Sequence, residues 1–100
     1  MHTRVPRVAR VLALALECEQ LLVRGEVRSC AELARLGQVS RPRMTQIMNL
    51  LHLAPDIQES ILFLEPRLGA SPLRMTDLQP MLRHMDWDTQ RELWQQRQRH

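Results

Sequence analysis

The stretch S-C-A-E-L-A-R-L-G-Q-V-S-R-P-R-M-T-Q-I-M-N-L-L, residues 29–51, carries the signals of two short helices separated by a turn. Ser29 precedes Glu32 by three residues, which is the spacing of a capping box, in which both side chains accept hydrogen bonds from backbone N–H groups. We therefore expect the first helix to begin near Cys30. Gly37 is expected to end it, because glycine adopts the left-handed conformation without a steric penalty.

A second helix is expected directly after this turn. Ser40 is a favourable N-cap and Pro42 fits a first helical turn, so the helix should run from about Arg41 to Leu53. The residues expected between the two helices are the small Ala34 and the apolar Leu33, Leu36, Val39, Met44, Ile47 and Leu51. This pattern predicts a helix-turn-helix over about residues 29–53. An ordinary helical hairpin is the alternative.

The second helix should present a polar face opposite Met44, Ile47 and Leu51. That face carries Arg41, Thr45, Gln46 and Asn49. Their donors and acceptors match the edges of base pairs, and Ser40 and Arg43 are placed to meet phosphates. The sequence therefore predicts a reader of double-stranded DNA whose second helix enters the major groove.

Composition favours an all-α fold, a compact bundle of about five helices. The chain of 100 residues suits one domain, residues 1–100, and only 3% of its residues are aromatic. A long first helix is expected from Pro6 to Gly25, and supporting helices are expected over residues 55–98. The expected boundaries among the latter are Pro55 to Leu64, a short helix capped by Thr76 that runs to His84, and a last helix capped by Asp86.

The positive charge is concentrated in the first half of the chain. All 14 basic residues are arginine; residues 1–53 hold eight arginines against four acids, net +4, and residues 54–100 hold six against seven, net −1. Arg4, Arg7 and Arg10 form a basic ridge that could lie on a DNA backbone. The alternative, of equal weight, is that this ridge is a solvated face with loose ion pairs.

No cofactor or metal site is expected. Cys18 and Cys30 lack a metal-binding spacing, and the four histidines are scattered. Both cysteines fall in helical stretches, where buried free thiols are usual, and this suits a reducing cytoplasm. Catalysis is not expected either, because His84, Asp86 and Asp88 lack a nucleophile beside them.

A membrane location is not expected. Arg4, Arg7 and Arg10 precede the apolar run Val11–Leu16, which superficially resembles a signal peptide. The run is short and ends in acidic residues, so an amphipathic helix is the better interpretation.

Trp87 and Trp94 are seven residues apart and should share one face of the last helix with Leu93. Core packing is the favoured interpretation for this stripe, and for Met44, Met48, Met75, Met81 and Met85. The alternative is that the stripe binds a partner, either a second copy of the chain in a homodimer or another protein in an adaptor that does not bind DNA.

Two resemblances follow from these motifs. Residues 31–37, the pair Ser40-Arg41 and residues 45–59 resemble the central DNA-binding region of partition proteins of the ParB/KorB type. The resemblance implies a second motif helix in the major groove, supported by later helices. The family's nucleotide-binding and dimerisation domains are not expected in this sequence, so the resemblance extends to DNA binding and not to partition activity.

The whole chain also looks like small bacterial proteins that accompany the site-specific recombinases of mobile elements. The stretch R-V-P-R-V-A-R, residues 4–10, and the stretch R-E-L-W, residues 91–94, carry this looser resemblance. It implies an accessory or regulatory role in a mobile element, plasmid or recombination system, with a recombinase as partner.

Overall fold

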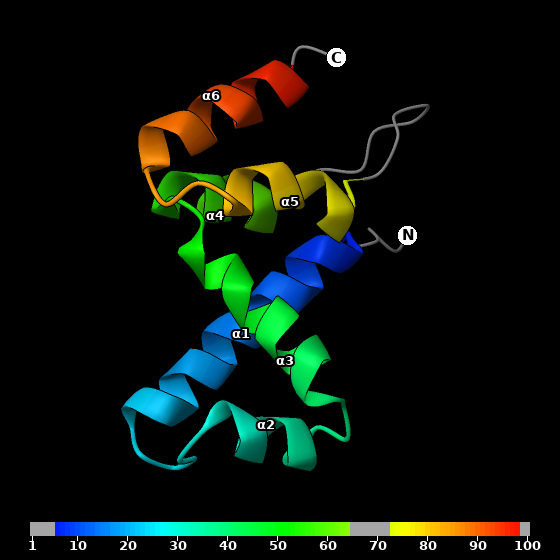
Figure 1. The fold of residues 1–100 in the computed structure, drawn as a ribbon, viewed down its shortest axis with the longest axis vertical. Helices are drawn as coiled ribbons and strands as arrows, with labels where there is room; N and C mark the ends of the chain where they lie inside the picture. The colour runs from blue at the N-terminus through cyan, green and yellow to red at the C-terminus, as the bar shows by residue number, and fades with distance from the viewer. Residues whose placement is uncertain (1–5, 65–72, 99–100) are drawn as a thin grey trace.

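The computed structural model describes residues 6–64 and 73–98, and that part of the chain is entirely helical and turn (Figure 1). The six α-helices and one 3₁₀ turn are α1 (Arg7–Val23), α2 (Cys30–Leu36), α3 (Arg41–Asn49), η1 (Leu50–His52), α4 (Pro55–Leu62), α5 (Met75–Leu82) and α6 (Trp87–Gln98). The all-α expectation is confirmed, with six described helices instead of about five. The molecule is flattened, with extents of 41 × 39 × 22 Å.

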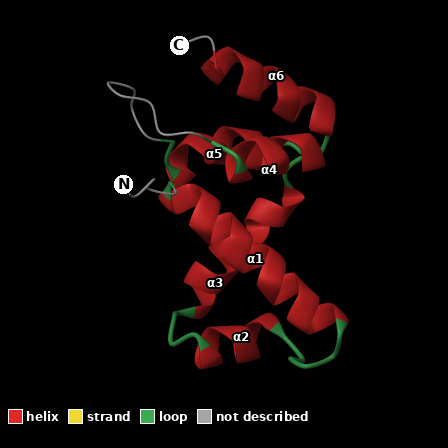
Figure 2. Cartoon of the chain, turned by 180° about the vertical axis from the view of Figure 1, so that it is seen from behind, coloured by secondary structure: helices red, strands yellow, loops and turns green. Residues whose placement is uncertain are grey.

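The helices lie in two groups, one at each end of the molecule, and α1 and α3 connect the groups. Figures 1 and 2 show α2 at one end and α4, α5 and α6 gathered at the other, with α1 running the length between them. Both views show α3 crossing beside α1, and α1 packs on α3 and on α4. Each end therefore has its own set of buried side chains.

Serine caps begin α2 and α3 where the sequence places them. Ser29 Oγ accepts a hydrogen bond from the Glu32 N–H at 3.2 Å, and Ser40 Oγ accepts one from the Arg43 N–H, also at 3.2 Å. The reciprocal bond of the expected capping box is shifted by one residue, because Glu32 Oε2 accepts from the N–H of Arg28 at 3.1 Å. The carboxylate thus satisfies a backbone group just before the cap.

The turn between α2 and α3 differs from the expectation at one residue. Gly37 has φ −83°, and the left-handed conformation falls on Gln38, with φ +56°. The Gly37 N–H still bonds to Leu33 O at 2.9 Å, so the chain reverses only after it. A Cβ at position 37 would lie 3.3 Å from Leu33 O. A glycine therefore suits this position because of the close approach of the Leu33 carbonyl, and not because of a left-handed conformation.

The segment after α3 tightens before α4 begins. The expected helix to Leu53 ends as an α-helix at Asn49 and continues as η1. Gln58 Nε2 donates to the carbonyls of Leu51 at 3.1 Å and Leu53 at 2.9 Å, so these groups are satisfied outside an α-helical ladder. The helix beginning at Pro55 is confirmed, although it ends two residues earlier than expected.

The caps of α5 and α6 correct one expectation and confirm another. Thr76 lies inside α5; the carboxylate of Asp77 accepts from the Arg74 N–H at 2.8 Å instead. Pro80 remains inside α5, where it cannot donate the backbone hydrogen bond to the carbonyl four residues earlier, and the helix ends two residues later at Leu82. Asp86 caps α6 as expected, accepting from the Thr89 N–H at 2.9 Å.

The first helix is close to the expected length. It spans Arg7–Val23, and Gly25 follows with φ +75°. Its last residue, Val23, is 76% exposed because the helix has passed the end of its buried face.

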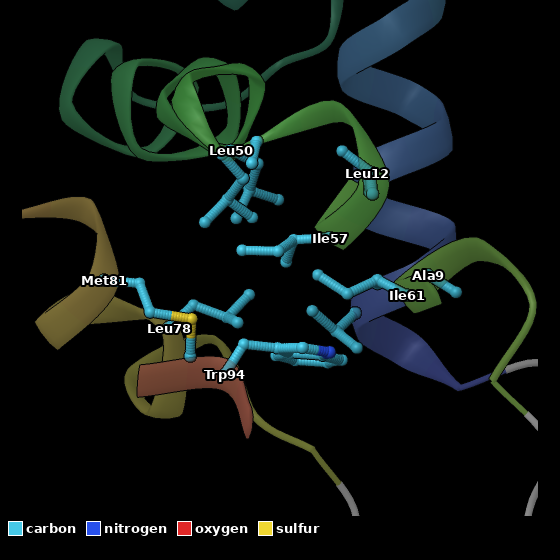
Figure 3. Packing of buried hydrophobic residues seen from close by; sticks show 11 residues of the cluster. Ala9, Leu12, Leu50, Ile57, Ile61, Leu78, Met81 and Trp94 are labelled. Atoms are coloured by element: carbon cyan, nitrogen blue, oxygen red, sulfur yellow. The ribbon is translucent and has the colours of Figure 1, made fainter. Parts of the chain in front are cut away.

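The larger core, here the main cluster, lies at the α4–α6 end (Figure 3). Side chains from α1, η1, α4, α5 and α6 meet in it: Val8, Ala9, Leu12, Leu50, Leu53, Ala54, Ile57, Ile61, Leu78, Met81 and Trp94. Ten of these eleven residues are at most 2% exposed. This cluster fixes η1 and hence the end of α3.

The smaller core, here the small cluster, lies between α1, α2 and α3. Its buried members are Cys18, Val27, Leu33, Ala34 and Met44. Leu36 and Val39 were expected to join them but are 64% and 36% exposed. The short α2 offers only one inward face, which Leu33 and Ala34 occupy, so Leu36 is turned outward.

A buried glutamine connects α6 to the start of α4. Gln90 is fully buried; its Oε1 accepts from the Ala54 N–H at 2.8 Å. Its Nε2 donates to the carbonyls of His52 at 3.2 Å and His84 at 2.9 Å. Three backbone groups from two segments, residues 52–54 and the link before α6, are therefore held by one side chain, and every polar group of that side chain is used.

Three predictions about exposed and buried side chains need correction. Trp94 packs in the main cluster as favoured, but Trp87 is 47% exposed, so the two do not form one buried stripe. Met85 is 81% exposed because it lies in the link between α5 and α6. Cys18 is buried, and this burial raises the pKa of its thiol, whereas Cys30 is exposed at the start of α2.

Among the described helices, none combines the length and apolar character needed to cross a membrane.

Candidate nucleic-acid interface

The outer face of α3 presents the side chains expected to read DNA. Arg41, Thr45 and Gln46 are exposed and Asn49 is half-buried. The opposite side of α3 buries Met44 and Ile47, which are each 4% exposed. The structure therefore brings all four polar residues to one side of a helix that is anchored through its apolar side.

A hydrogen bond within α3 organises this face. Arg43 Nη1 donates to Gln46 Oε1 at 2.8 Å. One lone pair of the amide oxygen and both hydrogens of the Gln46 amide nitrogen remain available for other partners. Arg43 thus orients Gln46, a relationship that the spacing of the two residues at i and i+3 permits.

Ser40, also expected to contact DNA, is the N-cap residue of α3. Its Oγ accepts from the Arg43 N–H, and the hydroxyl hydrogen remains available as a donor. The side chain is exposed at the start of α3, so it can cap the helix and donate to an anion at the same time.

A hollow of ≈ 640 Å³ lies between α3 and α5. Its α3 wall is Arg41, Pro42, Thr45, Gln46 and Asn49, and its α5 wall is Met75, Gln79, Leu82 and Arg83. Sequence reasoning did not identify the α5 wall. No local pattern marks Gln79 or Arg83, because their proximity to α3 depends on how α5 packs over the main cluster.

A second hollow, of ≈ 540 Å³, lies on the α2 side of α3. Arg28, Arg35 and Arg41 contribute its cations, and Glu32 contributes one carboxylate. Arg41 lines both hollows, so the first turn of α3 stands between them.

The arginines around α3 differ from those of the α4–α6 end in their partners. Within the described residues, the ion pairs shorter than 4.0 Å are Arg24 with Glu26, Arg91 with Asp56 and Asp88, and Arg97 with Asp77. None of them involves Arg28, Arg35, Arg41, Arg43 or Arg83. Residues 28–49 hold four arginines against one acid, a net charge of +3. Within residues 6–64 and 73–98, the five arginines around α3 are therefore cations that take part in no ion pair.

The basic ridge at the N-terminus lies elsewhere. Arg7 and Arg10 are exposed in the first turns of α1, whose Val8 and Ala9 pack in the main cluster. Neither arginine lines the hollows beside α3, and Arg4 lies outside the described residues. The structure does not bring this ridge together with the face of α3.

The acidic residues considered for catalysis have a structural explanation. Hydrogen bonds from the side chain and backbone N–H of Thr89 hold the pKa of the Asp86 carboxyl below its ordinary value of 3.8. Asp88 pairs with Arg91 at 3.2 Å. In the described part of the chain, no group of three His, Cys, Asp or Glu side chains is placed to hold a metal ion.

No protein-family model, curated protein or solved structure matches the chain. The interpretation of the site therefore depends on its own geometry.

Proposed function

We propose that the protein binds double-stranded DNA in a sequence-specific manner, with α2 and α3 as a helix-turn-helix. The observation that carries the proposal is the outer face of α3. It joins exposed polar side chains to a surrounding set of arginines that form no ion pair in the part of the chain that the structure describes. Base-edge readers and phosphate-binding cations are the two classes of contact that specific DNA binding requires.

The packing of α2 against α3 supports the proposal. Leu33, Ala34 and Met44 meet in the small cluster, and the serine caps fix where each helix begins. An α-helix held by one apolar face projects its other face outward, and the major groove is wide enough to admit it.

Each side chain of the face has a role that its chemistry suits. Arg41 can donate twice to guanine, and Gln46 or Asn49 can pair with adenine. Thr45 offers a hydroxyl and a methyl group. Ser40 and Arg43 meet the phosphates, and Arg43 additionally holds Gln46 in position.

The first test is selection of bound fragments from random DNA, followed by titration of the enriched duplex. Gln46→Ala should weaken binding to the selected site by about 1–3 kcal/mol and relax the preference at one base. Equal losses on selected and random duplexes would refute the assignment of Gln46 as a base reader.

Arg43→Ala separates two contributions. Loss of a phosphate contact should weaken binding to all sequences and lower the salt dependence. Because Arg43 Nη1 also bonds to Gln46 Oε1, the variant should in addition lose part of the preference at the base that Gln46 reads. Gln46→Ala in the Arg43→Ala background should then cost less than in the native chain.

For the biological setting, we propose an accessory or regulatory role in a mobile element, plasmid or recombination system. The basis is twofold. The segment that contains helices α2, α3 and α4 resembles the DNA-binding region of the ParB/KorB type, and the whole chain resembles recombinase-associated proteins. A homodimer is proposed because one small module buries little DNA surface, and a palindromic selected site would support it.

A helical adaptor that binds a protein through its tryptophans is the second candidate. Exposed Trp87 and Met85 favour it, whereas Trp94 is engaged in the main cluster and is not available as an anchor. A salt titration of the complex between the chain and its bound partner distinguishes DNA binding from the adaptor function. DNA binding through several phosphates weakens steeply with salt, and an apolar contact responds little.

A further inference from the structure

We infer that the hollow between α3 and α5 holds one sugar-phosphate strand of the bound duplex, with Gln79 and Arg83 as its outer wall. This inference rests on the proposed function and extends it to α5, outside the helix-turn-helix.

The dimensions of a helix and of the groove lead to this arrangement. An α-helix with its side chains is about 10–12 Å across, and the major groove is about 12 Å wide. A helix that enters the groove therefore fills it, and the two flanking strands contact the protein on either side of the helix. On the α5 side of α3, the surface available to a strand is the ≈ 640 Å³ hollow.

The composition of the hollow suits a DNA strand. Arg83 contributes a cation and Gln79 a neutral donor from the α5 wall, and the side chains proposed to face the adjacent bases, Arg41, Thr45 and Gln46, line the opposite wall. Acidic residues are absent from its described lining. Met75 and Leu82 supply apolar surface, which matches the deoxyribose between phosphates. Phosphates and apolar sugar edges therefore both have complementary groups in the lining of this hollow.

Arg83 is available for this contact. It is exposed directly after α5, and among the described residues it takes part in no ion pair shorter than 4.0 Å. Its position is set by α5, whose Leu78 and Met81 are buried in the main cluster. The main cluster therefore holds the outer wall at a fixed place relative to α3.

The experiment compares Arg83→Gln with Arg91→Gln in the full chain, using a labelled 30-base-pair duplex of random sequence. The two variants lose the same charge, but Arg91 pairs with Asp56 and Asp88 and does not line either hollow. Each phosphate contact contributes about −0.9 to the slope of log affinity against log salt, equivalent to about eightfold in affinity per decade of salt. Arg83→Gln should lose one such contribution, and Arg91→Gln should lose none.

A second matched pair does not depend on Arg83. Gln79→Glu places an anion in the wall of the hollow, and Gln95→Glu places one on the exposed side of α6. Only the first should weaken binding to the random duplex. Thermal unfolding of all four variants identifies any that lose their structure.

The outcomes separate this inference from the proposed function. If Arg43→Ala weakens binding while Arg83→Gln and Gln79→Glu behave like their controls, the strand does not lie in this hollow, and the helix-turn-helix proposal stands. If the native chain shows no salt-dependent binding to any duplex, both proposals are wrong.

Discussion

The two ends of the molecule differ in the size of their buried cores and in the ion-pair partners of their arginines. At the α4–α6 end, eleven side chains form the main cluster, and Arg91 and Arg97 are neutralised by nearby aspartates. At the α2–α3 end, five side chains form the small cluster, and Arg28, Arg35, Arg41 and Arg43 have no ion pair among the described residues. The larger core and most of the ion pairs therefore lie at one end, and the proposed DNA-binding face lies at the other.

The largest expected effect tests the difference between the two cores. Leu78→Ala in the main cluster should lower the free energy of unfolding by about 4–5 kcal/mol, and Leu33→Ala in the small cluster by about 2–3 kcal/mol. Leu78 is fully buried among many neighbours, whereas Leu33 lies in a small core that can relax around the deletion. Urea unfolding measures both, and equal losses would show that the two clusters act as one core.

The buried glutamine provides the next test. Gln90→Leu removes three hydrogen bonds and leaves the Ala54 N–H buried without a partner, at a cost of about 1–3 kcal/mol. Gln58→Leu is the matched substitution at a partly buried site; it removes two hydrogen bonds to carbonyls and leaves no buried backbone N–H without a partner, so it should cost less. The midpoints of urea unfolding compare them. A Gln90→Leu protein as stable as the native chain would contradict the structural role of this side chain.

Two double variants with the same loss of charge separate stability from binding. Arg91→Gln with Arg97→Gln breaks surface ion pairs and should cost about 0.2–1 kcal/mol of stability per pair, with little effect on DNA. Arg28→Gln with Arg35→Gln should leave stability within about 0.5 kcal/mol, because surface substitutions away from specific contacts change it little.

The second double variant should instead lower the slope of log DNA affinity against log salt by about 2. Both arginines line the hollow on the α2 side of α3, where the second strand would lie. Identical DNA affinities for the two double variants would remove the proposed distinction between the ends.

The smallest effect concerns acid stability at the α6 cap. The pKa of Asp86 is lowered in the folded protein, so its contribution is present above the ordinary value of 3.8 and is lost as the pH falls through the lower folded value. Asp86→Ser keeps a capping oxygen but does not titrate. The fall in the unfolding temperature of the native chain below pH 4 should therefore be reduced in the variant; parallel curves would contradict this account.

Local signals in the sequence predicted the features that depend on a few neighbouring residues. Ser29, Ser40 and Asp86 cap helices where expected, and Pro55 begins α4. The same reasoning was wrong for Thr76. The Asp77 carboxylate accepts a hydrogen bond from the Arg74 N–H, and the helix therefore begins at Met75, earlier in the sequence than expected.

Features that depend on distant packing were not predicted. Glutamine is usually exposed, so nothing local marked Gln90 as fully buried. The seven-residue spacing of Trp87 and Trp94 placed them on one face but not at one depth, since α6 buries Gln90 and Trp94 and Trp87 lies at its exposed first residue. Arg83 reaches the hollow beside α3 because of how α5 docks, which periodicity does not encode.

The helix α1 belongs to both ends, since Leu12 lies in the main cluster and Cys18 in the small one. Its central amide hydrogens should therefore exchange with solvent deuterium only when both clusters open together. The amides of α2 depend on the small cluster alone and should exchange faster. A gradient of protection along one continuous helix would thus record, residue by residue, how strongly the two ends are coupled.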